Sequence, residues 1–264
     1  MKHTNSQFLF LGTGSSLGVP VMGCQCLVCQ STSEFNHRLR PSALITTSHE
    51  KKILIDCGPD LRQQILRHRI QAIDGLIITH AHNDHTAGID DLRPFCYRQE
   101  KPLPCLLSKE TAQDIFKRFY YMFDQETSKH QSVTKFDWHY LEKDTGSISL
   151  DEIKIEYLTY EQLGMKVNGF RFGNLAYICD IRSYPSSIFD LLKGVDILIV
   201  SALRFTPSAV HFSVDEAVEF SKKVGASKTW LTHISHDLEH EKTNAYLPAN
   251  VQLAYDGLQF EFLL

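Results

Sequence analysis

The chain has 264 residues, of which 43% are hydrophobic and 22% are charged, and its formal net charge is −4. This composition is typical of a globular protein with a sizeable core. It contains no run of Lys and Arg that would indicate a dedicated nucleic-acid surface, and no stretch approaches the roughly 18 apolar residues of a membrane helix.

The N-terminal residues lack the long apolar segment of a signal peptide, so we expect a cytoplasmic protein with no membrane partner. Seven cysteines, an odd number, without a secretory signal argue against a disulfide framework. No linker, repeat or low-complexity tract interrupts the chain, and residues 1–264 are expected to form one domain.

The first half of the chain predicts strands in hairpins followed by helices. Residues 7–12 (QFLFLG) predict a strand, and residues 12–42 a loop rich in Gly, Pro, Ser and Cys. Further along we expect a hairpin over 43–56, a helix over 61–70, a buried strand over 75–79, a helix over 88–98, a strand over 103–108 and a helix over 109–123.

The second half repeats this order. We expect a strand pair over 147–160, a hairpin over 169–180 that turns at Gly173-Asn174, a strand over 194–200, a helix over 213–225 and a strand over 228–233. Two mixed sheets packed face to face, with helices outside, fit this order of elements in an α/β (α+β) protein.

A dense group of metal-binding residue types follows the strand over 75–79. The segment ITHAHNDH carries His80, His82, Asp84 and His85. Imidazoles and carboxylates at this spacing, supported by a strand end, supply ligands for two adjacent divalent cations. The alternative is a polar loop with solvated histidines, which this density in a chain of thirteen histidines disfavours.

Two later strand ends offer further ligands. Asp180 ends the segment LAYICD, where a carboxylate can bridge two cations, and His233 ends KTWLTH.

Three cysteines in the N-terminal loop form a second candidate metal site. Cys24, Cys26 and Cys29 have the spacing C-x-C-x-x-C, and His236, in HISH, is the candidate fourth ligand. Such a Cys3His set would be closed by protein ligands, so the expected metal is a structural zinc. Unpaired buried thiols are the alternative.

These motifs resemble the metallo-β-lactamase superfamily over nearly the whole chain. The resemblance rests on LGTGSS, LIDCGPD, THAHNDHTAG, AYICD and LTHISH. It implies an αββα sandwich and a di-metal hydrolase, with His80 and His82 on one metal, Asp84, His85 and His233 on the other, and Asp180 between them. The cysteines together with HISH resemble the PhnP-like subgroup of phosphoribosyl cyclic-phosphate phosphodiesterases, in which a Cys3His zinc lies away from the catalytic metals.

One position departs from the family pattern. Relatives place a histidine ligand about seven residues before a Gly-aromatic pair, and counting back from Gly169 reaches Gln162. An amide oxygen is a weak ligand for borderline metals, so the first metal site is expected to be weaker, to hold a harder ion or to be completed by water. A shifted alignment would put Glu161 there instead.

Three more residues have candidate roles at the mouth of the site. His211, just before a helix start, matches the proton donor of the subgroup, and a helix-start role is the alternative. Arg182 and Arg204 follow strand ends and are candidates to bind a substrate phosphate, with surface salt bridges as the alternative.

Residues 92–140 contain an aromatic cluster. Phe116, Phe119, Tyr120 and Phe123 fall on one face of the expected helix, which favours core packing or a homodimer contact over a lid or a stacking wall. The remaining histidines have no expected role in the site: His3, His37, His49, His68, His130, His139 and His240.

The function that these features favour is a phosphodiesterase on a small cyclic phosphate or a nucleotide-like diester. It would use two divalent cations, manganese or zinc with iron as a further option, and a separate structural zinc. The alternatives are an RNA-processing nuclease of the same superfamily, a thioester or lactone hydrolase, and a non-catalytic metal protein.

Overall fold

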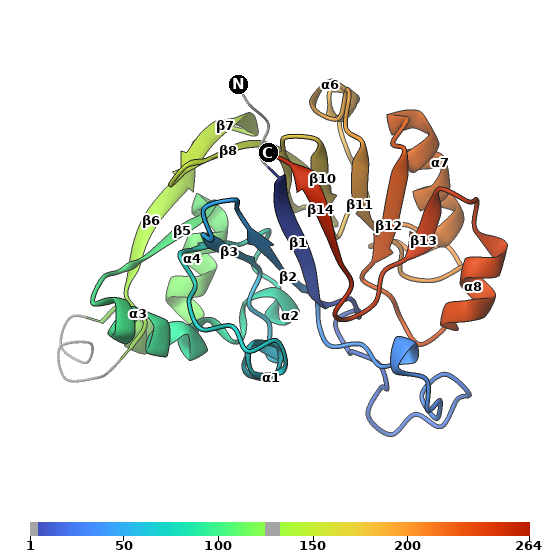
Figure 1. Ribbon diagram of the computed structural model, residues 1–264, viewed down its shortest axis with the longest axis horizontal. Coiled ribbons are helices and arrows are strands. Elements are labelled where there is room, and N and C mark those ends of the chain that lie inside the picture. Colours follow the sequence, from blue (N-terminus) through green and yellow to red (C-terminus); the bar gives the residue numbers. More distant parts are fainter. Residues whose placement is uncertain (1–4, 125–132) are drawn as a thin grey trace.

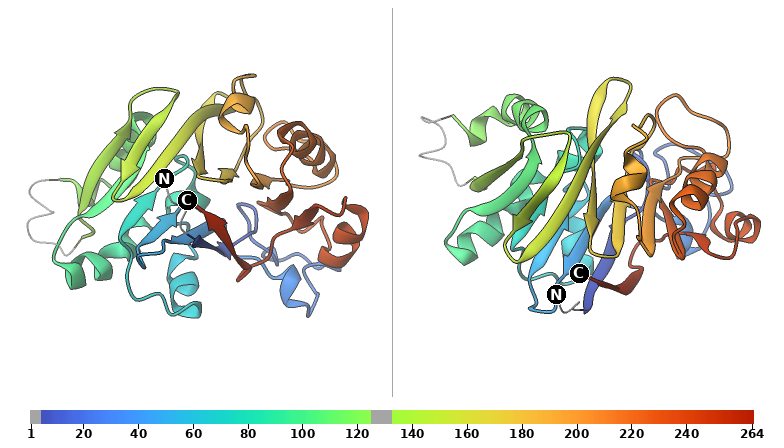
Figure 2. Two further views of the ribbon diagram at one scale, coloured as in Figure 1. Left: turned by 45° about the horizontal axis from the view of Figure 1, so that its top comes forward. Right: turned by 90° about the horizontal axis from the view of Figure 1, so that it is seen from above.

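Two seven-stranded mixed sheets face each other in the computed structural model, which describes residues 5–124 and 133–264 (Figures 1 and 2). The first sheet has the order β14 (Gln259–Leu263), β1 (Asn5–Gly12), β2 (Ser42–Thr46), β3 (Lys52–Ile55), β4 (Gly75–Ile77), β5 (Leu103–Ser108) and β6 (Phe136–Leu141). The second has the order β13 (Val251–Leu253), β12 (Lys228–Thr232), β11 (Ile197–Ser201), β10 (Leu175–Ile178), β9 (Met165–Phe172), β8 (Ile153–Gln162) and β7 (Thr145–Leu150).

Helices cover the outer face of each sheet. Those that follow first-sheet strands are α1 (Leu61–Arg67), α2 (Asn83–Thr86), α3 (Arg93–Gln99) and α4 (Lys109–Arg118), with the 3-10 turns η2 (Ile89–Leu92) and η3 (Tyr120–Met122). Those of the second half are α6 (Ile188–Leu191), α7 (Val214–Val224) and α8 (His240–Tyr246), and the 3-10 turn η1 (Glu34–Asn36) lies in the long N-terminal loop. The αββα architecture expected from the sequence is therefore confirmed.

Each sheet combines antiparallel and parallel pairs. Strands β3 to β6 pair in parallel, and so do β10 to β13. Parallel neighbours end at the same rim of a sheet, so residues that follow β3 and β4 are brought together, as are those that follow β10 and β12. This arrangement places the candidate ligands.

Strands in the middle of each sheet are buried on both faces, because side chains alternate between two apolar layers. In β3, Ile53 and Ile55 pack between the sheets, whereas Leu54 packs against α1 and α3. In β10, Tyr177 packs between the sheets and Ile178 packs toward α6 and α7. The strands have continuous apolar runs because one apolar layer lies between the sheets and another lies between each sheet and its helices.

Helix α7 shows how local sequence sets an element's ends. The Ser213 hydroxyl accepts a hydrogen bond from the Glu216 backbone N–H, and the Glu216 carboxylate accepts one from the Ser213 N–H. This capping box starts the helix after His211, and Gly225 ends it with φ of 75°, which favours glycine.

Two expected helices differ in the structure. The one expected over 88–98 is a 3-10 turn followed by α3, and the aromatic-rich one ends at Arg118 instead of residue 123. Phe119 leaves the helical region at φ of −112° and ψ of 38°, so the aromatic residues do not share one helical face. Residues 125–132, within the segment 92–140, lie outside the described residues.

The aromatic cluster nevertheless packs largely inward. Phe116 and Phe123 contact each other with ring centroids 4.6 Å apart, and Phe116 lies 5.2 Å from Trp138 of β6. Tyr120, which was expected to lie on the same face, is 67% exposed. Core packing thus accounts for Phe116 and Phe123, but not for Tyr120.

Across residues 5–124 and 133–264, every helix is too short or too polar to cross a membrane. The strand β14 pairs with β1, so the first and last described strands lie side by side (Figure 1).

Candidate metal centre

The candidate ligands of both sheets converge at one rim of the sandwich. His80, His82, Asp84 and His85 follow β4, whereas Asp180 follows β10 and His233 follows β12 directly. The side chains of His80, His85, Asp180 and His233 are at most 1% exposed, and Asp84 is 6% exposed. Residues that are 153 positions apart in the sequence therefore share one polar cluster.

The first group of donor atoms is centred on His80, which contacts both His82 and Asp180. His80 Nε2 lies 2.9 Å from His82 Nδ1 and 3.5 Å from Asp180 Oδ2.

The second group is formed by Asp84, His85, His233 and the other oxygen of Asp180. Asp84 Oδ2 lies 3.4 Å from both His85 Nε2 and His233 Nε2. Asp180 Oδ1 lies 3.3 Å from His233 Nε2 and 3.6 Å from His85 Nε2. The two oxygens of Asp180 thus face different groups, which is the arrangement expected of a bridging carboxylate.

The donor set fits divalent cations. Within the described chain, His85 Nε2 is a buried ring nitrogen with no hydrogen-bond partner, and it faces Asp84 and Asp180. An unsatisfied buried polar atom costs about 1–3 kcal/mol, and a cation between these atoms would remove that cost. Imidazole nitrogens with carboxylate oxygens are typical ligands of zinc, manganese and iron.

The pKa shifts of the cluster also indicate a site for a cation. Burial raises the pKa of Asp180, but His233 and His85 outweigh it and hold that pKa well below its usual range. Burial lowers the pKa of His85, but the carboxylates of Asp84 and Asp56 raise it well above its usual range. The buried carboxylates thus favour a positive charge in the cluster, which a bound cation would supply.

Two residues without an expected role orient the histidines. The Asp56 carboxylate accepts hydrogen bonds from the Thr79 backbone N–H at 2.8 Å and from His85 Nδ1 at 2.7 Å. The Thr79 hydroxyl donates to Asp56 and accepts from His80 Nδ1 at 2.9 Å. These bonds leave the Nε2 atoms of both rings free to act as ligands. The sequence signal for Asp56 is a single acidic residue that ends the apolar run KILI.

Three residues of the centre have left-handed backbone conformations. Asp56, Asp180 and His233 have φ values of 59°, 55° and 58°. Non-glycine residues adopt this region at an energetic cost, and such residues gather at functional sites. In each case the turn comes at or just after a strand end.

His211 lies beside Asp180 and His233, and Gln162 contacts His211. His211 Nδ1 lies 3.9 Å from Asp180 Oδ2, and the His211 ring packs on that of His233 with centroids 4.5 Å apart. Burial, followed by the nearby His233, lowers the pKa of His211 to about 4. The buried Gln162 places its amide nitrogen 3.2 and 3.3 Å from the two His211 ring nitrogens. Glu161 is exposed, so a shifted alignment does not bring its carboxylate into the centre.

The two arginines have different surroundings. Arg182 Nη1 lies 2.6 Å from Glu216 Oε1, so its charge is paired at the start of α7. Arg204 is half-buried, and within the described ranges no ion pair involves it.

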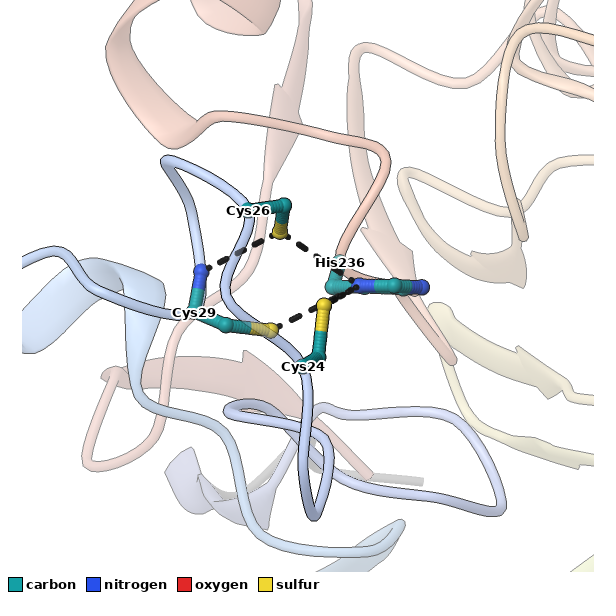
Figure 3. A group of neighbouring side chains, drawn as sticks. All are labelled: Cys24, Cys26, Cys29 and His236. Atoms are coloured by element: carbon teal, nitrogen blue, oxygen red, sulfur yellow. Dashed lines mark hydrogen bonds between the residues drawn. The ribbon is translucent and has the colours of Figure 1, made fainter.

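The cysteine group is assembled as expected (Figure 3). The sulfur atoms of Cys24, Cys26 and Cys29 lie 3.3, 3.5 and 3.5 Å from His236 Nδ1. In a tetrahedral site with Zn–S of about 2.3 Å and Zn–N of about 2.0 Å, the sulfur–nitrogen separation is about 3.5 Å. A hydrogen bond from the Cys29 backbone N–H is the largest cause that lowers the pKa of Cys26 to about 6, whereas burial raises the pKa of Cys29 to about 11.

The other histidines of the described residues make separate contacts. His49 bonds to Glu152, His37 to the Ser31 carbonyl and His139 to Asp137. His240 contacts Arg38, and His68 ends α1. His3 and His130 lie outside the described residues.

Known proteins resemble this chain in sequence and in fold. Residues 51–234 match the family described as the beta-lactamase superfamily domain. A crystal structure described as a new diphosphatase from the PhnP family has 36% sequence identity and a TM-score of 0.92, and the match covers 100% of this chain and 99% of that one.

Curated relatives differ more in length. An octanoyltransferase of Porphyromonas gingivalis is 31% identical over 255 residues, which are 95% of this chain and 50% of that protein. The match thus covers half the length of this curated relative. For the next curated relatives it covers about a third of their length. A ribonuclease Z of Listeria welshimeri is 24% identical over 97% of this chain and 99% of that protein.

Proposed function

Because the chain belongs to the metallo-β-lactamase superfamily and resembles a PhnP-family protein over its whole length, we propose that it is a metal-dependent phosphodiesterase of small substrates. The substrate class is a cyclic phosphate or a nucleotide-like diester. The observation that carries the proposal is that His80, His85 and His233 each lie within 3.6 Å of an oxygen of Asp180. Asp84, His82 and His211 adjoin this cluster.

The proposed ligands divide as the two donor groups do. His80, His82 and Asp180 Oδ2 would hold one cation, and Asp84, His85, His233 and Asp180 Oδ1 the other. When bound, the cations supply a nucleophile made from water near neutral pH and neutralise charge on the phosphoryl group. Manganese and zinc are the proposed metals, because imidazole and carboxylate suit both.

Side chains would orient the water, donate a proton to the leaving oxygen and bind the substrate phosphate. Asp84 has a second carboxylate oxygen that can accept a hydrogen bond from the attacking water and so orient it. His211, adjacent to Asp180, would donate a proton to the leaving oxygen as the phosphorus–oxygen bond breaks. The negative charge of a bound phosphodiester next to His211 would favour its protonated form. Arg204 is the proposed contact for a substrate phosphate, since Arg182 is already paired with Glu216.

The Cys24, Cys26, Cys29 and His236 group is proposed to hold a structural zinc. The four ligands close the site, so no position is left for a substrate. Such a zinc would join the N-terminal loop to the segment that follows β12 and His233.

A second candidate is hydrolysis of a phosphoanhydride. The whole-chain similarity to a diphosphatase of the PhnP family favours it. The same cations and the same proton donor would serve either leaving group, so substrate comparison is needed to separate the two.

The direct test is turnover by purified protein loaded with Mn²⁺ or Zn²⁺. We expect hydrolysis of bis(p-nitrophenyl) phosphate, and faster hydrolysis of a ribose cyclic phosphate than of a tRNA precursor or an acyl thioester. A preference for a nucleoside diphosphate derivative would favour the phosphoanhydride candidate. Stoichiometric metal without turnover on any of these substrates would instead favour a non-catalytic metal protein.

A further inference from the structure

We infer that the two cation positions differ in affinity, because the Gln162 side chain contacts His211 and does not act as a metal ligand. The second group, Asp84, His85, His233 and Asp180 Oδ1, would load first and hold its cation tightly. The first group, His80, His82 and Asp180 Oδ2, would hold an exchangeable cation. The inference rests on the metal binding in the proposed function, but not on any particular substrate.

The donor atoms of the two groups differ in number and charge. The second group offers two imidazole nitrogens and two carboxylate oxygens that lie 3.3 to 3.6 Å from their neighbours. The first group offers two imidazole nitrogens and one oxygen of the shared Asp180. His211 Nδ1 lies 3.9 Å from that oxygen, but Gln162 contacts this nitrogen at 3.2 Å. A site with fewer protein donors and less negative charge binds a divalent cation more weakly.

Burial differs in the same direction. The side chains of the second group are at most 8% exposed, whereas His82 of the first group is exposed. A cation in the first position would therefore lie closer to solvent.

Gln162 is the residue that could have completed the first group. It ends β8, is 3% exposed and reaches toward the centre. One end of its amide lies within 3.3 Å of both ring nitrogens of His211. In the described part of the chain, no hydrogen bond joins Gln162 to His80, His82 or Asp180. Whichever amide atom faces His211, that end of the side chain is committed to the imidazole.

The two cations would therefore differ in how readily they exchange with solution. The tightly held one would remain bound during purification. The other would bind only at higher metal concentration and would leave more coordination positions for water or a substrate oxygen. Gln162 would position His211 while it leaves the first group incomplete.

The test is Mn²⁺ binding to metal-free protein to which one equivalent of Zn²⁺ has been returned for the cysteine group. Isothermal titration and the electron paramagnetic resonance signal of free Mn²⁺ report affinities without any substrate. Wild type is expected to bind two Mn²⁺ ions with affinities that differ by about tenfold or more. His82→Ala should remove only the weaker ion, and His233→Ala should weaken the tighter one.

Substitutions of Gln162 give the decisive comparison. Gln162→His should raise the weaker affinity by about tenfold, because it adds an imidazole near the first group. Gln162→Leu should leave both affinities unchanged, and Gln162→Met serves as a second apolar variant if the first does not fold by circular dichroism. Two equal affinities in wild type, or weaker Mn²⁺ binding in the folded apolar variant, would overturn the inference. Unequal binding in a protein without turnover would keep the inference and reject the proposed function.

Discussion

The carboxylate of Asp56 and the imidazole of His85 lie 2.7 Å apart, and neither side chain has any exposed surface. Asp56 accepts from His85 Nδ1 and from Thr79, so each oxygen of the carboxylate meets a donor. This contact fixes the ring of a proposed ligand without touching the cation position.

Asp56→Asn is therefore expected to lower metal affinity in the second group by about 10–100-fold. The amide nitrogen would face either Thr79 or His85, and both offer donors there. Metal content after dialysis against a weak chelator measures the effect. Asp137→Asn, on a side chain that is 63% exposed, is the matched control, and equal metal retention in the two variants would reject the role of Asp56.

His82→Ala should reduce turnover of bis(p-nitrophenyl) phosphate by roughly a thousandfold or more, because a cation contributes several kcal/mol of charge stabilisation in the transition state. The variant should keep its fold, since His82 is exposed. His49→Ala, with a side chain that is 70% exposed, should retain the wild-type rate. An unchanged rate in His82→Ala would show that the proposed catalytic centre is wrong.

Cys26→Ala should instead act on stability. Loss of one zinc ligand is expected to lower the melting temperature by roughly 5–10 °C and to remove one zinc per chain, with little change in the rate at low temperature. Differential scanning fluorimetry and metal analysis by mass spectrometry measure the two effects. Leu27→Ala, in the same loop and 83% exposed, should change neither. A stable variant that retains its zinc would argue against the Cys3His site.

His211→Ala should show an effect that depends on the leaving group. A proton donor matters most when an alkoxide leaves, so hydrolysis of a ribose cyclic phosphate should fall by about 10²–10⁴-fold. Hydrolysis of bis(p-nitrophenyl) phosphate should fall far less, because p-nitrophenolate leaves without a proton. Equal losses on both substrates would indicate that His211 positions other groups and does not donate the proton.

The stability of the fold should fall in mild acid because of His240. Burial, and then the charge of Arg38, lower the pKa of His240 from 6.5 to about 4. The unfolded chain thus binds a proton between pH 6.5 and pH 4 that the folded chain does not, and the free energy of unfolding decreases as the pH falls through this range. The contribution is at most about 3 kcal/mol.

Urea unfolding at several pH values measures this dependence. Wild type should lose more stability between pH 6.5 and pH 4 than His240→Gln, in which residue 240 cannot titrate. Parallel curves for the two proteins would show that His240 is not responsible.

Much of the centre could be predicted from the sequence because its signals are local. His80, His82, Asp84 and His85 stand in one segment, and Asp180 ends a recognisable apolar strand. Asp56 was not assigned a role because a lone carboxylate at a strand end does not reveal which ring lies opposite. The contact of Gln162 with His211, 49 residues away, depends on how β8 and the loop before α7 pack, which no local pattern encodes.

Elements with weak patterns were also missed. β6 carries polar and partly exposed residues, and β13 and α8 are short. No Gly or Pro closely follows Arg118, so the sequence carries no signal that α4 ends there. The end of the helix coincides with the packing of Phe116 and Phe123 against Trp138, a contact between distant segments.

The pairing of β1 with β14 sets Asn5 opposite Leu263. The other end of β1 leads through Gly12 to Gly14, which pairs with Ile234 next to His233. The eight residues of β1, roughly 25 Å, therefore separate Asn5 and Leu263 from the strand end that leads to the metal centre. A fluorescent label attached at Asn5 or Leu263 would therefore lie at the end of β1 opposite the metal centre.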